Sequence, residues 1–226
     1  MLPNDWNPMR IKPSRKSIAG IAGLLLLAAP LAACGNDDDA GSGKAPTPVA
    51  AIADLSGGET TAIKLDKGFT DALASLKLTP GVLGGAKLTD GSLIFPITGG
   101  NVTIFTPGEV SPYVIGQIAH ESSGLSLEAG GTKVELRNLN VDPGVSRVYG
   151  DVVVNGEVAV TSAYLFRLNG STLKDLQTEG DTAILEGTKV FISDVAAGLL
   201  NDTFGTDAVT DQLLVGVAKI TVKVPS

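Results

Sequence analysis

The 226-residue sequence predicts a mainly β fold, an antiparallel β-sandwich or barrel-like sheet with one amphipathic helix near each end of the domain. Segments with strand patterns follow one another roughly every 8 to 12 residues, which is typical of sandwiches and barrels. Glycine-bearing turns separate them, and the Asn155-Gly156 pair is the strongest short signal for a β-hairpin. The pattern lacks the long crossovers that parallel strands require. These observations favour an antiparallel sheet over an α/β arrangement.

Residues 1–33 are expected to be a lipoprotein signal peptide. Four basic residues precede a short apolar run, residues 18–29, which is too short to span a bilayer comfortably. Leu31-Ala32-Ala33-Cys34 follows and resembles the lipobox of bacterial lipoproteins, in which cleavage before the cysteine leaves it carrying a lipid. Because Cys34 is the only cysteine, we expect lipidation there, with an ordinary secretory signal as the alternative. The protein would then be exported to the cell envelope and lipid-anchored, at the periplasmic face or the cell surface.

Residues 34–49 predict a disordered tether that leads to one β-rich domain, residues 50–226. The tether is acidic and then rich in Gly, Ser and Pro, so it cannot bury a core. Four of the 17 basic residues and one of the 24 acidic residues precede Cys34, which leaves a net charge of −10 after cleavage. This charge argues against nucleic acid and anionic headgroups as partners. The domain contains no cysteine, which excludes disulfides and CxxC metal sites.

The first helix is predicted to begin at Asp66, a plausible N-cap, and to end at Pro80-Gly81. Apolar residues of this segment recur at spacings of four and three, which places them on one helical face: Leu65, Phe69, Leu73 and Leu76. A second helix is expected over residues 193–204, with Val195, Leu199 and Leu200 as its apolar residues. Residues 206–213 would continue or repeat that helix.

Strands are expected over residues 92–97, 101–106, 113–119, 124–128, 133–139, 148–154, 158–168, 188–192 and 214–224. The first two should form a hairpin over residues 98–100, and Gly130-Gly131 should turn between the fourth and fifth. In the fifth strand the apolar set should face the core: Val134, Leu136 and Leu139. The charged set should face solvent: Lys133, Glu135 and Arg137.

His120 is the only histidine and the first candidate for binding chemistry. It could be a ligand or support one, or it could be a polar strand-end residue bonded to the turn at residues 121–123. One histidine without a second His or Cys cannot make a closed metal site, so none is expected. Tyr113 precedes it by seven residues and should face the opposite side of the same strand.

Several landmarks, taken in order, resemble the HtaA-type haem-binding domain of bacterial haem-uptake proteins. These are the early helix with Phe69, residues 116–120 leading into 124–127, residues 134–136, residues 150–152 and residues 199–205. The resemblance implies an antiparallel β-rich fold and a surface-exposed role in haem traffic. It also implies a haem-ligating tyrosine on the early helix with a supporting histidine. His120 matches the histidine, whereas the tyrosine position falls near Ala72-Leu73, and neither residue can ligate iron.

The function expected from these features is that of an envelope-anchored bacterial lipoprotein with a non-catalytic binding or interaction domain. The candidate ligand-binding residues are His120, Tyr113 and Phe69. GxSxG, HExxH and P-loop motifs are missing, so no catalytic residue is predicted; a hydrolytic enzyme that uses His120 is a weaker alternative. Expected partners are the membrane, through Cys34, and a small apolar ligand or an envelope protein. No cofactor is expected; the alternative is a haem-binding surface protein, and we predict weak or no haem binding.

Overall fold

The computed structural model describes residues 45–224. The predicted signal peptide, Cys34 and the tether up to residue 44 lie outside the described residues. The elements are β1 (Ala50–Ile52), β2 (Thr60–Leu65), α1 (Lys67–Ser75), β3 (Thr79–Gly84), β4 (Lys87–Thr89), β5 (Ser92–Pro96), β6 (Gly99–Ile104), β7 (Val114–Ala129), β8 (Thr132–Asp142), β9 (Arg147–Val154), β10 (Glu157–Asn169), the 3-10 turn η1 (Gly170–Thr172), β11 (Gln177–Glu179), β12 (Thr182–Ile192), α2 (Asp194–Phe204) and β13 (Leu214–Lys223).

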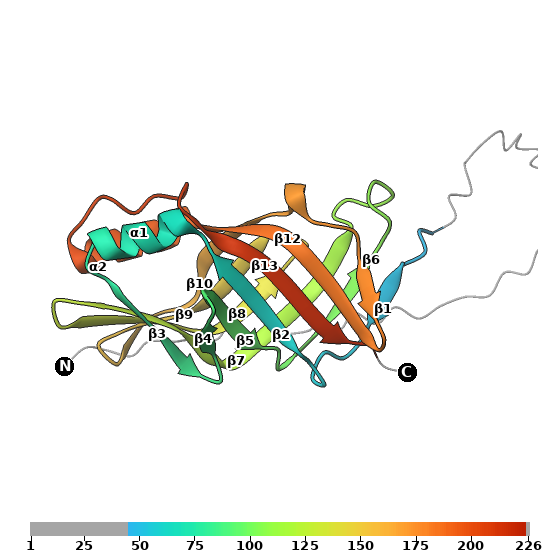
Figure 1. The fold of residues 1–226 in the computed structure, drawn as a ribbon, viewed down its shortest axis with the longest axis horizontal. Helices are drawn as coiled ribbons and strands as arrows, with labels where there is room; N and C mark the ends of the chain where they lie inside the picture. The colour runs from blue at the N-terminus through green and yellow to red at the C-terminus, as the bar shows by residue number, and fades with distance from the viewer. Residues whose placement is uncertain (1–44, 225–226) are drawn as a thin grey trace, which may run out of the picture. The chain divides into compact units, whose positions relative to one another are not determined.

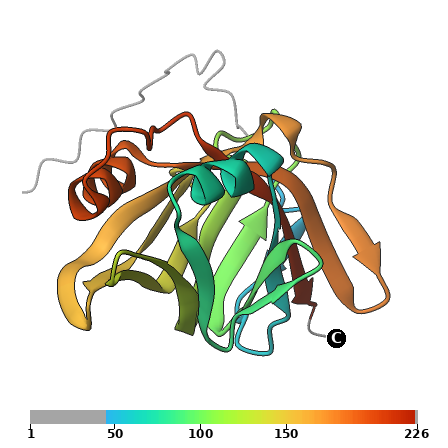
Figure 2. The ribbon, with the colours of Figure 1, turned by 60° about the vertical axis from the view of Figure 1, so that its left-hand side comes forward.

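The strands form one curled antiparallel sheet, a half-barrel, which confirms the predicted fold class (Figure 1). Its order is β1-β6-β7-β8-β9-β10-β12-β13-β2-β5-β4, with β3 added to β7 and β11 added to β12. The two helices come from opposite ends of the domain sequence, yet both lie at the same end of the half-barrel. Figure 2 shows them on the same side of the curled sheet. Neither helix of residues 45–224 is long and apolar enough to cross a membrane.

Helix α1 forms where the apolar periodicity predicts it. The Asp66 carboxylate accepts a hydrogen bond from the Gly68 N–H at 2.7 Å, and Phe69 and Leu73 are buried. The predicted stop at Pro80-Gly81 is wrong, because the helix ends at Ser75 and Lys77 takes a left-handed φ of 56°. Pro80 and Gly81 instead belong to β3, which pairs with β7.

The second helix also forms as predicted, with the Ser193 hydroxyl accepting from the Ala196 N–H at 2.9 Å. Its buried side consists of Ala196, Ala197 and Leu200, whereas Val195 is 44% exposed. Gly205, in a left-handed conformation, ends the helix. The predicted continuation through residues 206–213 is therefore wrong, since this segment is a loop.

The hairpins at Gly130-Gly131 and Asn155-Gly156 are confirmed, with β7 pairing to β8 and β9 pairing to β10. The hairpin predicted at residues 98–100 is wrong, since β5 pairs with β2 and β6 pairs with β7. Gly100, with a φ of 112°, lies so close to β7 that a Cβ atom there would sit 2.0 Å from the Gln117 carbonyl oxygen. This glycine permits close strand approach instead of a turn.

The two strands predicted over residues 113–128 are one strand, β7, interrupted by a bulge between His120 and Gly124. The predicted inward set of β8 is confirmed, because Val134, Leu136 and Leu139 are all buried. Glu135, which was expected to face solvent, is only 7% exposed. Its carboxylate is held between Lys133, at 2.8 Å, and the Arg137 guanidinium.

A ladder of polar side chains crosses the sheet where three strands bulge. Ser122 in β7, Asn138 in β8 and Ser162 in β10 have φ values of 56°, 53° and 51°. Asn138 accepts from the Ser122 N–H at 3.1 Å and donates to the Asp151 carboxylate at 2.9 Å. The other oxygen of Asp151 accepts from the Ser162 N–H at 3.1 Å. The ladder therefore supplies partners to backbone groups that the bulges remove from regular pairing.

Replacing the central residue of this ladder should destabilise the fold. In Asp151→Ala, the exposed Asn138 amide and Ser162 N–H lose their protein partner, which should lower the free energy of unfolding by about 0.5–1.5 kcal/mol. Chemical denaturation monitored by circular dichroism measures the change. Glu157→Ala, at an exposed site on the β9–β10 hairpin, is the control and should change stability by less than about 0.5 kcal/mol. Equal stability of the two variants would contradict a structural role for the ladder.

Candidate functional site: an apolar cavity that ends at His120

The concave side of the sheet encloses a cavity of about 120 Å³. Its walls come from β1, β2, β5 to β10, β12 and β13, together with the loop after η1. Among the lining residues only Thr61, His120 and Thr188 are polar. An apolar cavity of similar size, about 150 Å³, has been shown to stay dry and to bind benzene or xenon. The cavity is therefore suited to apolar ligand atoms.

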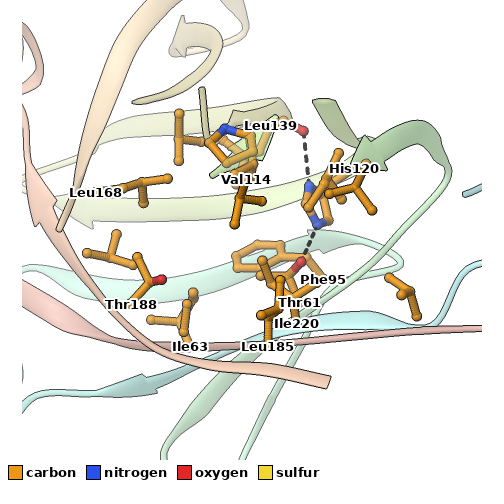
Figure 3. Close-up of a pocket in the computed structure, with 18 of the residues that line it drawn as sticks. Thr61, Ile63, Phe95, Val114, His120, Leu139, Leu168, Leu185, Thr188 and Ile220 are labelled. Carbon is orange, nitrogen blue, oxygen red and sulfur yellow. Dashed lines mark hydrogen bonds between the residues drawn. The ribbon is translucent and has the colours of Figure 1, made fainter. Parts of the chain in front are cut away.

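The cavity is closed at one end and open at the other. Around His120 the lining residues are fully buried, as for Thr61, Phe95 and Leu139. The half-exposed lining residues are Ala50, Pro143, Leu168, Leu173, Leu176, Leu185, Thr188 and Ile220. Figure 3 shows His120 and Phe95 on one side of the cavity and Leu168 and Thr188 on the other, while the half-buried Leu185 and Ile220 lie beside Thr61. The lining therefore combines a buried floor around His120 with an accessible mouth that reaches Ile220, next to Thr61.

His120 is only 2% exposed, and both of its ring nitrogens have partners. Nδ1 lies 3.2 Å from the Leu139 carbonyl oxygen, and Nε2 lies 2.8 Å from Thr61 Oγ1 (Figure 3). A carbonyl can only accept, so Nδ1 carries the proton, and Nε2 accepts from the Thr61 hydroxyl. The Phe95 ring packs edge-on against the imidazole, with centroids 6.2 Å apart.

Burial lowers the pKa of His120 to about 4, and the hydrogen bond to Leu139 opposes this shift only in part. The ring is therefore neutral at pH 7. The Thr61–His120–Leu139 triad, defined by these two hydrogen bonds, holds an uncharged imidazole at the floor of the cavity. Its second nitrogen is not free to coordinate a ligand unless the Thr61 hydroxyl moves.

The three predicted ligand-binding residues do not meet in one site. His120 lines the cavity, but Phe69 is on the buried face of α1 and does not line the cavity. Tyr113, just before β7, is half-buried against the core outside the cavity, and burial and Asp175 raise its pKa. The predicted bonding of the His120 ring to residues 121–123 is wrong, although the Ser123 hydroxyl donates to the His120 backbone carbonyl at 3.1 Å.

Sequence reasoning missed the partners of His120. Thr61 lies in a segment that carried no strand pattern before residue 65, and it is separated from His120 by 59 residues. The sequence pattern identified Phe95 and Leu139 only as apolar residues of predicted strands. Within residues 45–224 no group of three or more His, Cys, Asp or Glu side chains could hold a metal ion.

The similarity of this domain to known proteins is a similarity of fold only. No family model matches the sequence, and no curated protein matches it. The domain has a distant HtaA-like fold. It is similar to the crystal structure of the C-terminal domain of HtaA from Corynebacterium glutamicum, with a TM-score of 0.51 and 13% sequence identity over 76% of this chain and 98% of that one. A domain-swapped dimer of a variant of the same domain has a TM-score of 0.44 and 13% identity, over 70% of this chain and 90% of that one.

The burial of His120 predicts a loss of stability in mild acid. Its pKa is lower in the folded state than in the unfolded state, near 6.5, so the unfolded chain binds the proton more tightly. The free energy of unfolding should fall as the pH drops from about 6.5 to about 4, by on the order of 3 kcal/mol from this residue. Denaturation across this range, compared with His120→Gln, isolates the contribution. A wild-type profile parallel to that of the variant would contradict it.

Proposed function

We propose that this chain is an envelope-anchored lipoprotein whose β domain binds an apolar ligand and catalyses no reaction. The observation that supports it most directly is the cavity, which is apolar from its buried floor to its accessible mouth. Ligand sites of this kind are usually apolar with few polar groups. Here the polar groups of the floor, His120 and Thr61, already bond to each other.

The volume of about 120 Å³, below that of the benzene-binding cavity, and the aliphatic walls favour a small apolar group such as the end of an acyl chain. Most lining residues are Ala, Val, Ile or Leu, and the aromatic ones are Phe95 and Phe166. A chain of methylene groups needs only apolar contact, worth roughly 0.8 kcal/mol for each buried CH₂. It would leave the Thr61–His120–Leu139 triad undisturbed.

The lining residues also argue against catalysis. They include no carboxylate, cysteine, serine or lysine, so His120 has no nucleophile other than the Thr61 hydroxyl to activate. Thr61 is only 5% exposed, and its hydroxyl donates to Nε2. The Leu139 carbonyl fixes the ring tautomer. Catalysis is therefore disfavoured by the burial of Thr61 and by the lack of other reactive side chains in the lining.

A fluorescent fatty acid, of which only the chain end need enter the cavity, tests the ligand. We expect a saturable rise in fluorescence with the wild-type protein. Leu185→Trp, which adds an indole ring to the lining from β12, should abolish it. Lys189→Trp, on the same strand but outside the lining set, is the matched control and should bind as the wild type does. No saturable binding, or equal binding by both variants, would overturn the proposal.

Haem is the second candidate, because the fold is HtaA-like and His120 sits in an apolar wall. The residues present fit it poorly: Nε2 is bonded to Thr61, the early helix offers no tyrosine, and the cavity is narrow. In an absorbance titration, haemin should show little or no Soret shift on addition of the protein. A sharp shift in the wild type that disappears in His120→Ala would favour haem binding over the acyl chain.

Anchoring through Cys34 is tested separately. The chain should partition with membranes when it is expressed in a bacterial host. Cys34→Ala should either appear in the soluble fraction or accumulate as the uncleaved precursor, because the lipobox cysteine is the acceptor. Fractionation followed by mass spectrometry of the N-terminus reads out both results. Lipid-dependent partitioning of a cleaved Cys34→Ala chain would rule out this mode of anchoring.

A further inference from the structure

The apolar wall of the cavity continues onto the rim of its open end. Val49 is 58% exposed, Val145 is 56% exposed and Val224 is 38% exposed. These three residues are called the rim valines below. Single exposed apolar residues are common on protein surfaces and need no explanation. The rim valines suggest a binding surface only because of their positions near the mouth of the cavity.

Backbone hydrogen bonds tie each rim valine to the strand ends at the mouth. The Val49 N–H donates to Ile104, a lining residue, at 2.7 Å. Val145 lies in the β8–β9 turn, where the carbonyl of the next residue accepts from the N–H of lining residue Leu168 at 2.8 Å. The Val224 N–H donates to the Asp181 carbonyl at 2.7 Å, and Val224 follows β13, whose Val222 lines the cavity. Each rim valine therefore adjoins a segment that contributes to the lining.

Some charged side chains near the mouth are paired, whereas Asp175 and Asp181 form no ion pair within residues 45–224. Lys174, in the loop after η1, lies 3.1 Å from the Glu186 carboxylate, and Lys223, next to Val224, lies 3.9 Å from Glu59. Each pair is close to neutral in sum, which leaves the unpaired carboxylates of Asp175 and Asp181 as excess negative charge near the rim. These carboxylates disfavour anionic headgroups, so the exposed apolar groups of the rim suit contact with neutral or zwitterionic headgroups and the acyl region below them.

The tether also joins the domain at this rim. Val49 precedes β1, which lies at the opposite end of the half-barrel from the helices (Figure 1). Residues 35–49 span at most about 50 Å when fully extended. A lipid on Cys34 would keep the rim within that distance of a bilayer and would raise the local concentration of the bilayer surface.

We propose that the rim valines form a docking surface for a lipid bilayer, through which an acyl chain passes between the bilayer and the cavity. This inference rests on the proposed anchoring and ligand class. Apolar contact drives the docking, because the net charge of −10 after cleavage disfavours anionic headgroups. Docking should therefore occur on phosphatidylcholine alone and should persist at high salt concentration.

Single tryptophans report the docking in the full chain. Trp6 is the only tryptophan, so Trp6→Phe gives a background without one. Val145→Trp then reports from the rim. Val158→Trp is the matched control. Val158 is 63% exposed and pairs with Val153, at the end of β9 opposite the β8–β9 turn that holds Val145. Both chains are reconstituted into phosphatidylcholine vesicles with brominated acyl chains, held there by the lipidated Cys34 or by the apolar residues 18–29.

We expect brominated lipid to quench Val145→Trp and to leave Val158→Trp unchanged relative to vesicles without bromine. Val224→Trp serves as a second rim reporter and should behave as Val145→Trp does. Absent quenching at the rim, or equal quenching at Val158→Trp, would overturn the docking proposal and would indicate a protein partner for the rim instead. Fatty-acid binding by the same chains before reconstitution separates the two proposals. Loss of that binding with rim quenching intact would overturn the ligand class and leave the docking surface standing.

Discussion

The architecture depends on one buried polar contact, the His120 imidazole between the Thr61 hydroxyl and the Leu139 carbonyl. Along the sheet, the hydrogen-bonded path from β7 to β2 passes through β8, β9, β10, β12 and β13. The imidazole crosses the opening that this path leaves, since Thr61 is on β2 and His120 is on β7. Burying a polar ring without partners would cost several kcal/mol, and both nitrogens here are satisfied. The half-barrel is thus held shut at its floor by side chains.

A second contact reinforces this closure from the neighbouring loop. The Thr98 N–H and hydroxyl both donate to the Ala119 carbonyl, at 2.8 and 3.1 Å, and the same hydroxyl accepts from the Glu121 N–H. Thr98 connects β5 to β6, so it brings the β5 side of the sheet against β7 next to His120. Side-chain and backbone hydrogen bonds therefore join both β2 and the β5–β6 connection to β7 around His120.

Local sequence patterns predicted the elements whose causes are local. Asp66 and Ser193 cap the helices as expected, and Asn155-Gly156 turns between β9 and β10. Gly99-Gly100 also predicted a turn, yet both residues lie in β6. Gly100 is needed there because a neighbouring carbonyl approaches it closely, and the local sequence does not distinguish such a glycine from a turn glycine. The Thr61–His120 contact spans 59 residues and follows from how the sheet curls. The sequence therefore identified His120 as a candidate site residue but did not predict which side chains surround it.

A shared fold does not require the same ligand chemistry, and the contacts of His120 illustrate this. The HtaA-like fold is supported at 13% identity, a level at which architecture is shared and the groups in a site need not be. In this chain, iron coordination by Nε2 would remove its bond to Thr61 and so weaken the closure between β2 and β7. A ligand that needs only apolar contact makes no such demand, because it fills the space between the walls and leaves the triad intact. The same imidazole can therefore close the sheet and form the floor of the cavity only while it coordinates nothing.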